Sequence, residues 1–376
     1  MNPPTLCMIH EGVGNQSAIA KVAMDGVRHA LRAGWQVSVV AKILEPSLRA
    51  EVEWLPLFVP PRGFLLKWLT AEHFIRAALG TRAFDVIHAH QPQAAALSDV
   101  FTCHYLTRSV HERNGLPPWR GGRSALARLQ QLGALPAEDH YYRRWNPRTR
   151  MLFCSQLLRE EFLRFYPPPE RQEVMDNACP APDIPSEAER RAARAKIVGR
   201  DWAGPVLGYL GGIDERKGYR QLVRALEPES DIFLLLGGPS SETFPPDRLP
   251  GHCKPLGWIT NPAEFFAACD VLIVPSLFDP CALVALEAVA RGVPVIATGG
   301  VGALAALLQY SAGAVWEPGA PLGNLVRGVA ARRDAFQAGA LRMADALSEA
   351  RQSARLLAIY ETARCEKSRR RVAAAS

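Results

Sequence analysis

Two carboxylates, Asp279 and Glu287, stand eight positions apart in the apolar stretch PSLFDPCALVALEAVARGVPVIAT, residues 275–298. No other charged residue lies between them. Because a carboxylate without a partner is costly among apolar side chains, Glu287 needs one. Arg291, one turn further on, offers an i,i+4 pair worth about 0.2–0.5 kcal/mol, and a ligand hydroxyl is the other solution. Asp279, followed by Pro280, also has the pattern of a helix N-cap with proline at the first helical position.

A second candidate site is the glycine turn GGIDERKG, residues 211–218, which follows the apolar segment PVLGYL. It opens into a predicted amphipathic helix, and we expect Lys217 near the first turn of that helix. A helix N-terminus carries about half a positive charge and unpaired N–H groups, so it suits a phosphate. The alternative is a lysine that simply faces solvent. Two further glycine-rich bends, LLLGGPSSE and PLGWIT, follow later strand candidates.

The first half of the chain offers glycines and histidines at predicted strand ends. Gly12 and Gly14 stand between a strand and a helix in EGVGNQSAIAK. His88 and His90 end FDVIHAH, and His104 ends VFTCHY. A lone histidine at a strand end is usually structural. His104 is the stronger candidate because it lies where a cleft between two domains is expected.

These residues are positioned by alternating strands and helices. Short apolar runs alternate with amphipathic segments, which predicts an α/β fold with parallel sheets covered by helices. The strand candidates are TLCMIH, QVSVVAK, EVEWLPLFV, FDVIHAH, VFTCHY, RMLFCS, PVLGYLGG, DIFLLLGG, DVLIVPS, GVPVIAT and GAVW. The chain has 376 residues, enough for two domains. The Pro-, Ala- and charge-rich stretch 177–194 places a hinge between them.

The domain prediction is therefore two doubly wound, Rossmann-like domains facing a cleft. The first covers residues 1–180 and the second residues 181–350, and a C-terminal helix over 351–376 is expected to pack back on the first. A dinucleotide-dependent oxidoreductase shares this alternation. It is disfavoured because no full GxGxxG with an acid about twenty residues further on follows the first strand.

The composition limits which binding partners and which cellular compartment are expected. The chain is 48% hydrophobic and 22% charged, carries a formal charge of +7 and has a pI of about 9.1. This charge is compatible with nucleic acid, a membrane surface or an anionic substrate, but no nucleic-acid-binding pattern occurs, so no nucleic acid is expected. The eight cysteines show no CxxC pair, which indicates free thiols, a cytoplasmic protein and no metal site. We expect neither a signal peptide nor a membrane-spanning helix.

Taken together, these motifs resemble the retaining, nucleotide-sugar-dependent glycosyltransferases of family 4, which have the GT-B fold. The family hallmark is two carboxylates separated by seven residues ahead of a GxPVIA strand, matched here by Asp279, Glu287 and GVPVIAT. The blocks GGIDERKG, LLLGGPSSE, PLGWIT and CDVLIVPS match in order. FDVIHAH, CSQLLREEF and VMDNACP extend the resemblance over most of the chain.

The resemblance implies a role for each matching residue. Glu287 would hold the ribose of the donor, Asp279 and the amides after it the transferred sugar, and Lys217 the diphosphate. His104 would lie by the donor sugar and its reaction centre. The implied catalytic set is His104, Asp279 and Lys217. The implied donor-binding set is Gly14, Gly212, Arg216, Lys217, Gly257, Trp258, Asp279, Cys281, Ala282, Leu283 and Glu287.

The sequence also departs from the family pattern. Asp279 stands where the family usually has a glutamate, Ala282 where it has a glycine, and Gly212 where it has the arginine of the phosphate turn. Arg216, beside Lys217, is the candidate to supply the missing positive charge. No glutamate occurs among residues 304–306, after the GG turn near 300. The Asp-Pro variant is similar to sugar transferases of lipopolysaccharide synthesis.

The resulting prediction is a retaining, hexosyltransferase-like enzyme that moves a sugar from a nucleotide-sugar donor to a glycan or lipid-linked acceptor in the cell envelope. It would use no cofactor and no metal, because the leaving phosphate helps to deprotonate the acceptor. Lys217 and His104 are predicted to face one cleft. The alternative is a non-catalytic nucleotide-sugar-binding relative, or the partner subunit of an active transferase. The sequence does not specify the base, the sugar, the acceptor or the oligomeric state.

Residues 105–150 form a basic stretch interleaved with aromatic residues. It predicts peripheral contact with an anionic membrane on the cytoplasmic side, where a lipid-linked acceptor would lie. The alternatives are a solvated basic face whose aromatic residues lie in the core, and an anionic soluble acceptor. The stretch contains nine arginines: Arg108, Arg113, Arg120, Arg123, Arg128, Arg143, Arg144, Arg148 and Arg150. It contains only three acidic residues, Glu112, Glu138 and Asp139, and the interleaved aromatic residues are Trp119, Tyr141, Tyr142 and Trp145.

Overall fold

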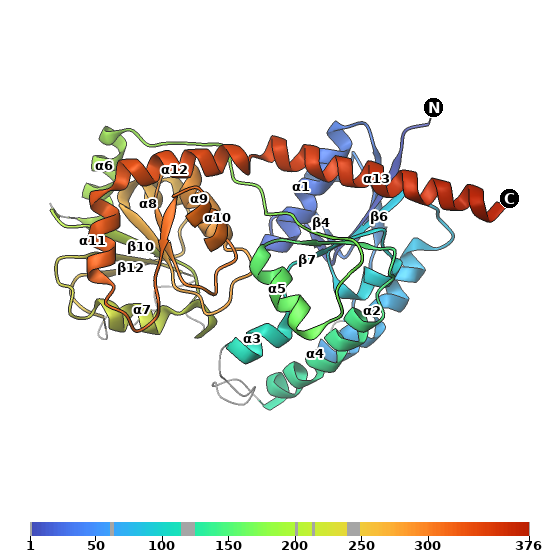
Figure 1. Cartoon of the computed structure of the whole chain (residues 1–376), viewed down its shortest axis with the longest axis horizontal. Helices are drawn as coiled ribbons and strands as arrows, with labels where there is room; N and C mark the ends of the chain where they lie inside the picture. Colours follow the sequence, from blue (N-terminus) through green and yellow to red (C-terminus); the bar gives the residue numbers. More distant parts are fainter. Residues whose placement is uncertain are drawn as a thin grey trace. The chain divides into compact units, whose positions relative to one another are not determined.

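The computed structural model describes residues 2–60, 64–113, 125–199, 202–212, 215–238 and 249–375 (Figure 1). Contacts divide the chain into two compact units. The first comprises residues 1–175 and 350–376, and the second residues 176–349. The boundary thus falls at residue 175, five positions before the predicted one, and the chain from residue 350 onward returns to the first unit.

The first unit is built on a parallel sheet of seven strands in the order β5-β3-β1-β6-β7-β8-β9. The strands are β1 Thr5–Ile9, β3 Gln36–Ala41, β5 Glu53–Pro56, β6 Val86–Ala89, β7 Val100–Cys103, β8 Arg150–Phe153 and β9 Gln172–Val174. A small sheet pairs β2 Gly12–Val13 with β4 Ile43–Leu44. The helices are α1 Ala18–Arg32, η1 Pro46–Leu48, α2 Phe64–Leu79, η2 Pro92–Leu97, α3 Thr107–Arg113, α4 Ala125–Arg143, α5 Gln156–Phe165 and α13 Glu349–Ala375.

The second unit repeats the architecture with a six-stranded parallel sheet in the order β12-β11-β10-β13-β14-β15. Its strands are β10 Val206–Leu210, β11 Phe233–Gly237, β12 Cys253–Gly257, β13 Val271–Val274, β14 Val295–Ala297 and β15 Gly313–Val315. Its helices are α6 Glu187–Val198, η3 Glu215–Lys217, α7 Tyr219–Leu226, α8 Pro262–Ala268, α9 Leu283–Ala290, α10 Leu304–Gln309, α11 Gly323–Ala331 and α12 Arg333–Ala346.

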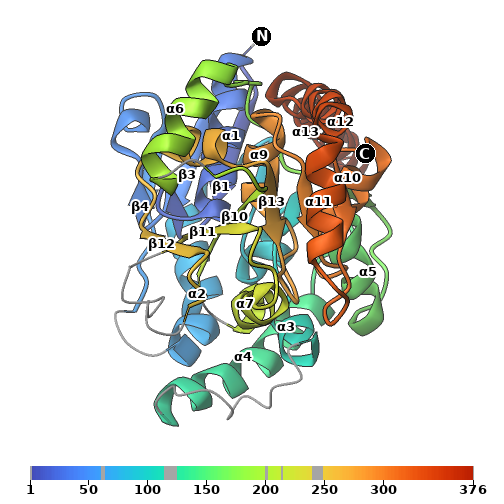
Figure 2. The same ribbon diagram turned by 90° about the vertical axis from the view of Figure 1, so that its left-hand side faces the viewer.

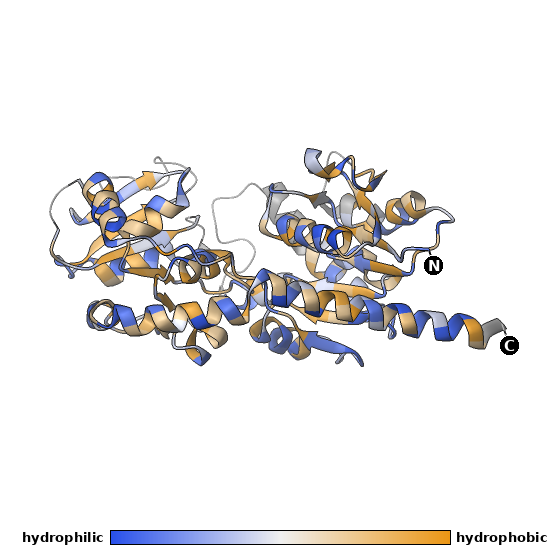
Figure 3. Cartoon of the chain, turned by 90° about the horizontal axis from the view of Figure 1, so that it is seen from above, coloured by the Kyte–Doolittle hydropathy of each residue, from blue (hydrophilic) through white to orange (hydrophobic). Residues whose placement is uncertain are grey.

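Alternate side chains of the second sheet pack into two cores. Phe233 and Leu235 of β11 join the core under α6, α8, α9 and α12. Leu234 and Leu236 join the opposite core, under α7 and α11. Figure 2 shows β12, β11, β10 and β13 side by side, with α7 below the sheet and α9 above it. Both faces of a parallel sheet are covered in this way, which explains why its strands are continuous apolar runs (Figure 3).

The predicted α/β fold with parallel sheets is confirmed, but the sequence did not reveal two edge strands. β12 contains Lys254 and Pro255 within five residues, and proline is tolerated only on edge strands because it lacks a backbone donor. β9 has only three residues, all half-buried. Neither strand shows the apolar run that identifies the central strands.

Helix α13 is joined to the first unit by buried polar contacts. His88 on β6 lies 2.7 Å from the Tyr360 hydroxyl through Nδ1 and 2.8 Å from Thr102 Oγ1 through Nε2. His88 and Tyr360 are 1% and 0% exposed. Both ring nitrogens of the buried His88 imidazole therefore have hydrogen-bond partners while the ring is uncharged. Further along α13, Lys367 donates to Asp99 at 2.7 Å.

The burial of His88 predicts that the free energy of unfolding depends on pH. It lowers the pKa of His88 from 6.5 to about 3, so the unfolded chain takes up a proton below pH 6.5 that the folded chain does not. The stabilisation is fully present above pH 6.5 and is lost as the pH falls towards 3. His88→Gln should flatten the slope of the free energy of unfolding by about 1.4 kcal/mol per pH unit between about pH 6 and 4. Urea unfolding across that range measures it. Exposed His140→Gln is the control, and an unchanged slope in His88→Gln would contradict the assignment.

Candidate functional site

An ion pair joins two loops at the carboxyl edge of the second sheet. Lys217 Nζ lies 2.6 Å from Asp279 Oδ2. Lys217 follows β10 and Asp279 follows β13, and these parallel strands are neighbours in the sheet. Asp279 is 7% exposed, so the lysine is held by a largely buried carboxylate. In open α/β sheets this edge is where ligands bind.

Lys217 stands before the helix, not inside it. The sequence predicted this lysine in the first turn of a helix, but it closes the 3-10 turn η3, and α7 begins at Tyr219 after the N-cap Gly218. Gly218 has a φ of 71°, and a Cβ there would lie 1.9 Å from the Pro275 carbonyl oxygen. Only glycine fits this conformation and this close approach. The turn therefore directs Lys217 towards the segment that carries Asp279.

Arg216 ties the same turn to that segment. Its carbonyl accepts a hydrogen bond of 2.8 Å from the Leu277 amide, and its guanidinium donates to the Phe278 carbonyl at 3.3 Å. Gly212, earlier in the loop, accepts a hydrogen bond from the Tyr209 hydroxyl. Residues 213 and 214 of the predicted phosphate turn lie outside the described residues.

Asp279 is not the helix N-cap that the sequence suggested. Its amide donates to the Gly300 carbonyl and its carbonyl accepts from the Gly302 amide, each at 2.8 Å. Because these bonds hold Asp279 in a strand-like bridge with the 300–302 segment, α9 begins only at Leu283. The N-cap is Ala282, which makes no side-chain capping bond. The Asp279 carboxylate is held by Lys217 instead.

Glu287 lies half-buried on α9. Arg291 donates to its backbone carbonyl at 3.3 Å, and the guanidinium carbon of Arg291 lies 5.5 Å from the centre of the Phe266 ring. The contact therefore joins Arg291 to the backbone of Glu287, and the arginine also stacks on an aromatic face.

The remaining donor-side residues of the second unit lie on the same edge of the sheet. Gly257 ends β12 with a φ of 67°, and Trp258 after it is 72% exposed. Ala282 is buried, and its neighbours Cys281 and Leu283 are half-buried. The loops after β10, β12 and β13 thus bring these predicted residues to one edge, since all these strands run in parallel, whereas Glu287 lies inside helix α9.

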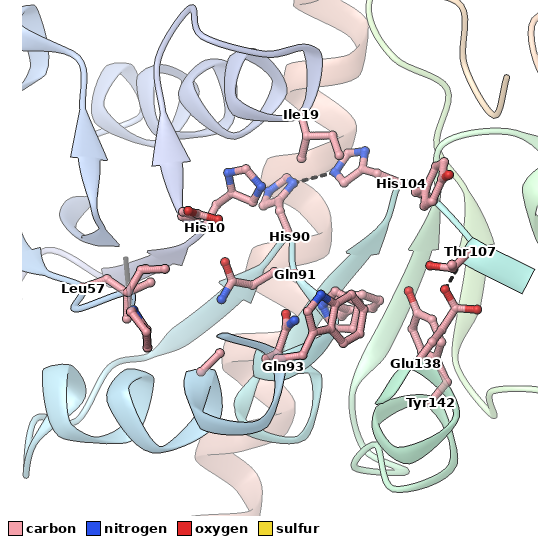
Figure 4. Close-up of a pocket in the computed structure, with 18 of the residues that line it drawn as sticks. His10, Ile19, Leu57, His90, Gln91, Gln93, His104, Thr107, Glu138 and Tyr142 are labelled. Atoms are coloured by element: carbon pink, nitrogen blue, oxygen red, sulfur yellow. Dashed lines mark hydrogen bonds between the residues drawn. The ribbon is translucent and has the colours of Figure 1, made fainter. Parts of the chain in front are cut away.

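In the first unit, three histidines lie at neighbouring strand ends beside a cavity of about 200 Å³. Figure 4 shows His10, His90 and His104 in a row with His90 in the middle. His90 Nδ1 lies 2.7 Å from His104 Nε2, and His10 Nδ1 lies 2.5 Å from the Gly12 carbonyl oxygen. His104 is therefore positioned by His90.

Two of the histidines next to the cavity, His90 and His104, are uncharged at neutral pH. Burial, helped by the neighbouring imidazoles, lowers the pKa of His104 to about 3 and that of His90 well below 6.5. At neutral pH His104 acts as a neutral hydrogen-bond partner and not as a cation. Gly14 lies close by along the chain, between β2 and α1, and its amide donates to the Ala20 carbonyl at 3.2 Å.

The sequence reasoning missed three residues beside this cavity. His10 ends the first strand, and Gln91 and Gln93 follow the strand that ends in His90. Their position directly after strands was the available signal. Lys217 and His104 belong to different units, so the expectation that they face one cleft stays a prediction. Within the described part of the chain, no cluster of three or more metal-ligating side chains occurs, and no helix is long and apolar enough to cross a membrane.

The basic stretch is only partly available for a partner. Trp119, Arg120 and Arg123 lie outside the described residues, as does the side chain of Arg128. Tyr141 and Tyr142 are 7% and 1% exposed, as the alternative with core aromatic residues predicted. Three arginines are paired: Arg108 with Asp139 at 2.7 Å, Arg113 with Glu161 at 2.6 Å and Arg150 with Glu173 at 3.4 Å. Arg143, Arg144 and Arg148 are exposed, and Trp145 is half-buried.

The ion pair at the edge of the second sheet predicts a coupled stability effect. Lys217→Ala leaves the Asp279 carboxylate largely buried without this partner, and should lower the free energy of unfolding by about 1.5–3 kcal/mol. Adding Asp279→Asn to the same chain should recover part of this loss, because the neutral amide costs less to bury. Denaturant unfolding of the two single variants and the double variant gives the coupling energy. Strictly additive effects would show that the pair contributes nothing.

Two family models match the chain. "Glycosyltransferase Family 4" matches residues 19–180, and "Glycosyl transferases group 1" matches residues 204–329. Among curated proteins, D-inositol 3-phosphate glycosyltransferase of Xylanimonas cellulosilytica is 33% identical over 129 residues, 31% of each chain. The lipopolysaccharide core biosynthesis glycosyltransferase LpsE of Rhizobium meliloti is 32% identical over 25% of this chain and 29% of its own. The chain thus spans about a third of these relatives.

A longer alignment joins the chain to D-inositol 3-phosphate glycosyltransferase 1 of Catenulispora acidiphila, with 25% identity over 94% of this chain and 92% of that one. Among solved structures, WaaG, a glycosyltransferase involved in lipopolysaccharide biosynthesis, superposes with a TM-score of 0.69. It is 18% identical and covers 90% of this chain and 94% of its own. HepE of Anabaena, solved with UDP-glucose, has a TM-score of 0.66, 16% identity and coverage of 95% and 99%. The two structures support the fold.

Proposed function

Because this chain belongs to the family 4 glycosyltransferases and has the GT-B fold, we propose that it transfers a sugar from a nucleotide-sugar donor to a glycan or lipid-linked acceptor, with retention of configuration. The observation that carries the proposal is the Lys217–Asp279 pair at the carboxyl edge of the second sheet. Departure of a nucleoside diphosphate needs positive charge held in advance where negative charge develops. Lys217 supplies that charge in a fixed position.

The neighbouring residues fit the other parts of such a donor. Glu287, half-buried on α9, would accept hydrogen bonds from the ribose hydroxyls. Asp279 and the backbone around Cys281, Ala282 and Leu283 would hold the transferred sugar. Trp258 and Gly257 offer an exposed aromatic face and a turn for the base. Arg216 adds positive charge beside Lys217, where Gly212 provides none.

No metal ion is needed in this proposal. Lys217 and Arg216 supply the positive charge at the diphosphate, and the leaving phosphate takes up the acceptor proton. Neutral His104 would then serve as a hydrogen-bond partner near the transferred sugar. The similar proteins WaaG and LpsE are glycosyltransferases of lipopolysaccharide biosynthesis, which supports an envelope glycan as the acceptor class.

A non-catalytic nucleotide-sugar binder is the second candidate, and Gly212 and Ala282 are the observations that favour it. Both replace residues that the family pattern places at the donor. A donor-hydrolysis assay separates the two candidates. Release of nucleoside diphosphate from a bound nucleotide sugar supports the enzyme, and binding without release supports the binder.

The experiment that tests the donor site is calorimetry on Glu287→Gln. A thermal-shift screen of UDP-, GDP-, ADP- and TDP-sugars first identifies the donor, with UDP-glucose included because HepE was solved with it. The substitution keeps the size of the side chain but removes its charge, and should weaken binding of that donor by about 1.5–3 kcal/mol. The control is Glu227→Gln, an exposed residue at the far end of α7. Unchanged affinity in Glu287→Gln would rule out ribose binding by Glu287.

A lipid-linked acceptor would require contact with an anionic membrane, and α2 and α4 carry suitable side chains. Leu66 and Leu69 on α2 are 52% and 66% exposed. The Tyr141 hydroxyl on α4 donates to the Trp68 carbonyl on α2 at 2.6 Å, so the two helices are neighbours. Exposed apolar side chains beside exposed arginines suit the headgroup layer of a cytoplasmic membrane face.

Vesicle co-sedimentation tests this contact. Binding should require anionic lipid, fall as salt rises, and weaken when Arg143 and Arg144 become Glu, because each basic residue near such a surface contributes about 1 kcal/mol. The matched control is the double change Arg220→Glu and Arg224→Glu on α7, where both arginines are exposed. Absence of binding to anionic vesicles at low salt would leave a soluble acceptor.

A further inference from the structure

Two arginines share one aspartate at the amino-terminal edge of the second sheet, the edge opposite to the loops of the proposed donor site. Asp270 directly precedes β13. Its carboxylate accepts hydrogen bonds from Arg190 Nη2 at 3.0 Å, from Arg194 Nη2 at 3.1 Å and from the Val206 amide at 2.8 Å. Arg190 is only 5% exposed. Both oxygens of this single carboxylate are therefore in use.

Helix α12 passes close to the start of α6, which carries these two arginines. A Cβ built on Gly292 would lie 2.6 Å from Gln337 Nε2 on α12 and 2.9 Å from Ile184 Cδ1, just before α6. The two segments therefore meet at Gly292. Arg333, the first residue of α12, lies one turn before Gln337 and so on the same face of the helix. This places a third arginine next to the first turn of α6.

The Arg333 guanidinium lacks partners on the edge that binds anions. Its Nε and Nη2 are buried, and neither has a hydrogen-bond partner among the residues that the structure describes. These two nitrogens form one edge of the planar guanidinium, which can donate two parallel hydrogen bonds to a carboxylate or a phosphate. Burial, followed by the charge of Arg190, lowers the pKa of Arg333. A buried cation beside a second cation is costly unless an anion compensates it.

The charge of this cluster suits a dianion. Arg190, Arg194 and Arg333 bring three positive charges, and Asp270 brings one negative charge, which leaves a net charge of +2. A phosphate group carries about −1.5 to −2 charges at pH 7 and has three strong acceptor oxygens. A carboxylate carries one charge and two oxygens. Phosphate therefore matches both the charge and the number of free donors better.

Access to Arg333 requires a side chain to move, because both nitrogens without partners are closed off from solvent. Glu187, in the first turn of α6, is the candidate. Its carboxylate lies 3.6 Å from Arg190 Nε, its side chain is 78% exposed, and its charge also acts on Arg333. A surface carboxylate of this kind is weakly held. A dianion can therefore take its place between the two arginines.

We propose that Arg333 and Arg190 bind a phosphate group at the amino-terminal edge of the second sheet, either free phosphate or the phosphate of a small metabolite. Arg333 would donate two hydrogen bonds from Nε and Nη2, and Arg190 would add its charge on the side that Glu187 now faces. The bound phosphate would join α12 to α6. This site lies at the opposite edge of the sheet from the proposed donor site and does not rest on the proposed transfer.

Calorimetry on the full chain, without nucleotide and at constant ionic strength, tests this site. The ligands are orthophosphate, ribose 5-phosphate and acetate at pH 7.5. At least one phosphate should bind roughly tenfold more tightly than acetate, because its charge matches the cluster. Tighter binding of ribose 5-phosphate would identify a phosphorylated metabolite as the ligand, and tighter binding of orthophosphate would identify free phosphate. Acetate that binds as well as both phosphates, or no phosphate binding at low ionic strength, overturns the proposal.

Variants locate the bound phosphate. Arg333→Gln removes the charge and the two-donor edge, and should weaken phosphate binding roughly tenfold. Glu187→Gln should strengthen it, because the competing carboxylate is lost. Arg342→Gln is the matched control, an exposed arginine on the same helix that donates to the Tyr310 carbonyl at 3.1 Å, and it should change nothing. If Arg333→Gln fails to fold, Arg333→Lys keeps the charge without the two-donor edge and should also weaken binding. Equal effects at Arg333 and Arg342 would contradict the assignment.

The proposed donor site also attracts phosphate, and Lys217→Ala separates the two sites. Phosphate binding that persists in Lys217→Ala and is lost in Arg333→Gln supports the site at the amino-terminal edge. Binding that is lost in Lys217→Ala and kept in Arg333→Gln would place the phosphate at the donor edge. That result would overturn this proposal and leave the proposed function intact.

Discussion

The ion pair between Lys217 and Asp279 joins the loops after two neighbouring parallel strands, β10 and β13. It constrains the loops on both sides. Gly218 must be a glycine because its left-handed backbone passes against the Pro275 carbonyl. Asp279 is held by backbone bonds to the 300–302 segment, which delays the start of α9 to Leu283. The pair holds the lysine ammonium group at the edge of the sheet where a donor diphosphate would lie, and positive charge fixed at that position is the physical basis of the proposed transfer.

Both units bring candidate residues together at the carboxyl edge of a parallel sheet. In the second unit the loops hold a lysine against a buried carboxylate, with Arg216 beside it, where a charged donor would lie. In the first unit the strand ends bring His10, His90 and His104 together beside a small cavity, and burial lowers the pKa of His90 and His104. The net charge of +7 therefore describes neither site.

Particular elements show how far the sequence could be used. The central strands were predictable because both faces of a parallel sheet are buried, so they appear as apolar runs such as FLLLG and VLIV. The edge strands β9 and β12 were not, since β9 has only three residues and β12 contains Lys254 and Pro255. The Asp-Pro pair resembled an N-cap locally, but long-range bonds to residues 300–302 override that preference. Lys217 lies before α7 because the helix begins only after Gly218, whose backbone is left-handed.

By itself, the sequence determined the family, the α/β class and the candidates Lys217, Asp279, Glu287 and His104, because ordered motifs and apolar periodicity are local properties of the chain. Only the tertiary structure decided which of them touch. The Lys217–Asp279 contact joins residues 62 positions apart, and the His88–Tyr360 contact joins residues 272 positions apart. Gln93 and His10 became candidates only when the strand ends met around one cavity. Contacts of this kind depend on strand order, and strand order is set by packing of the whole unit and not by any short stretch of residues.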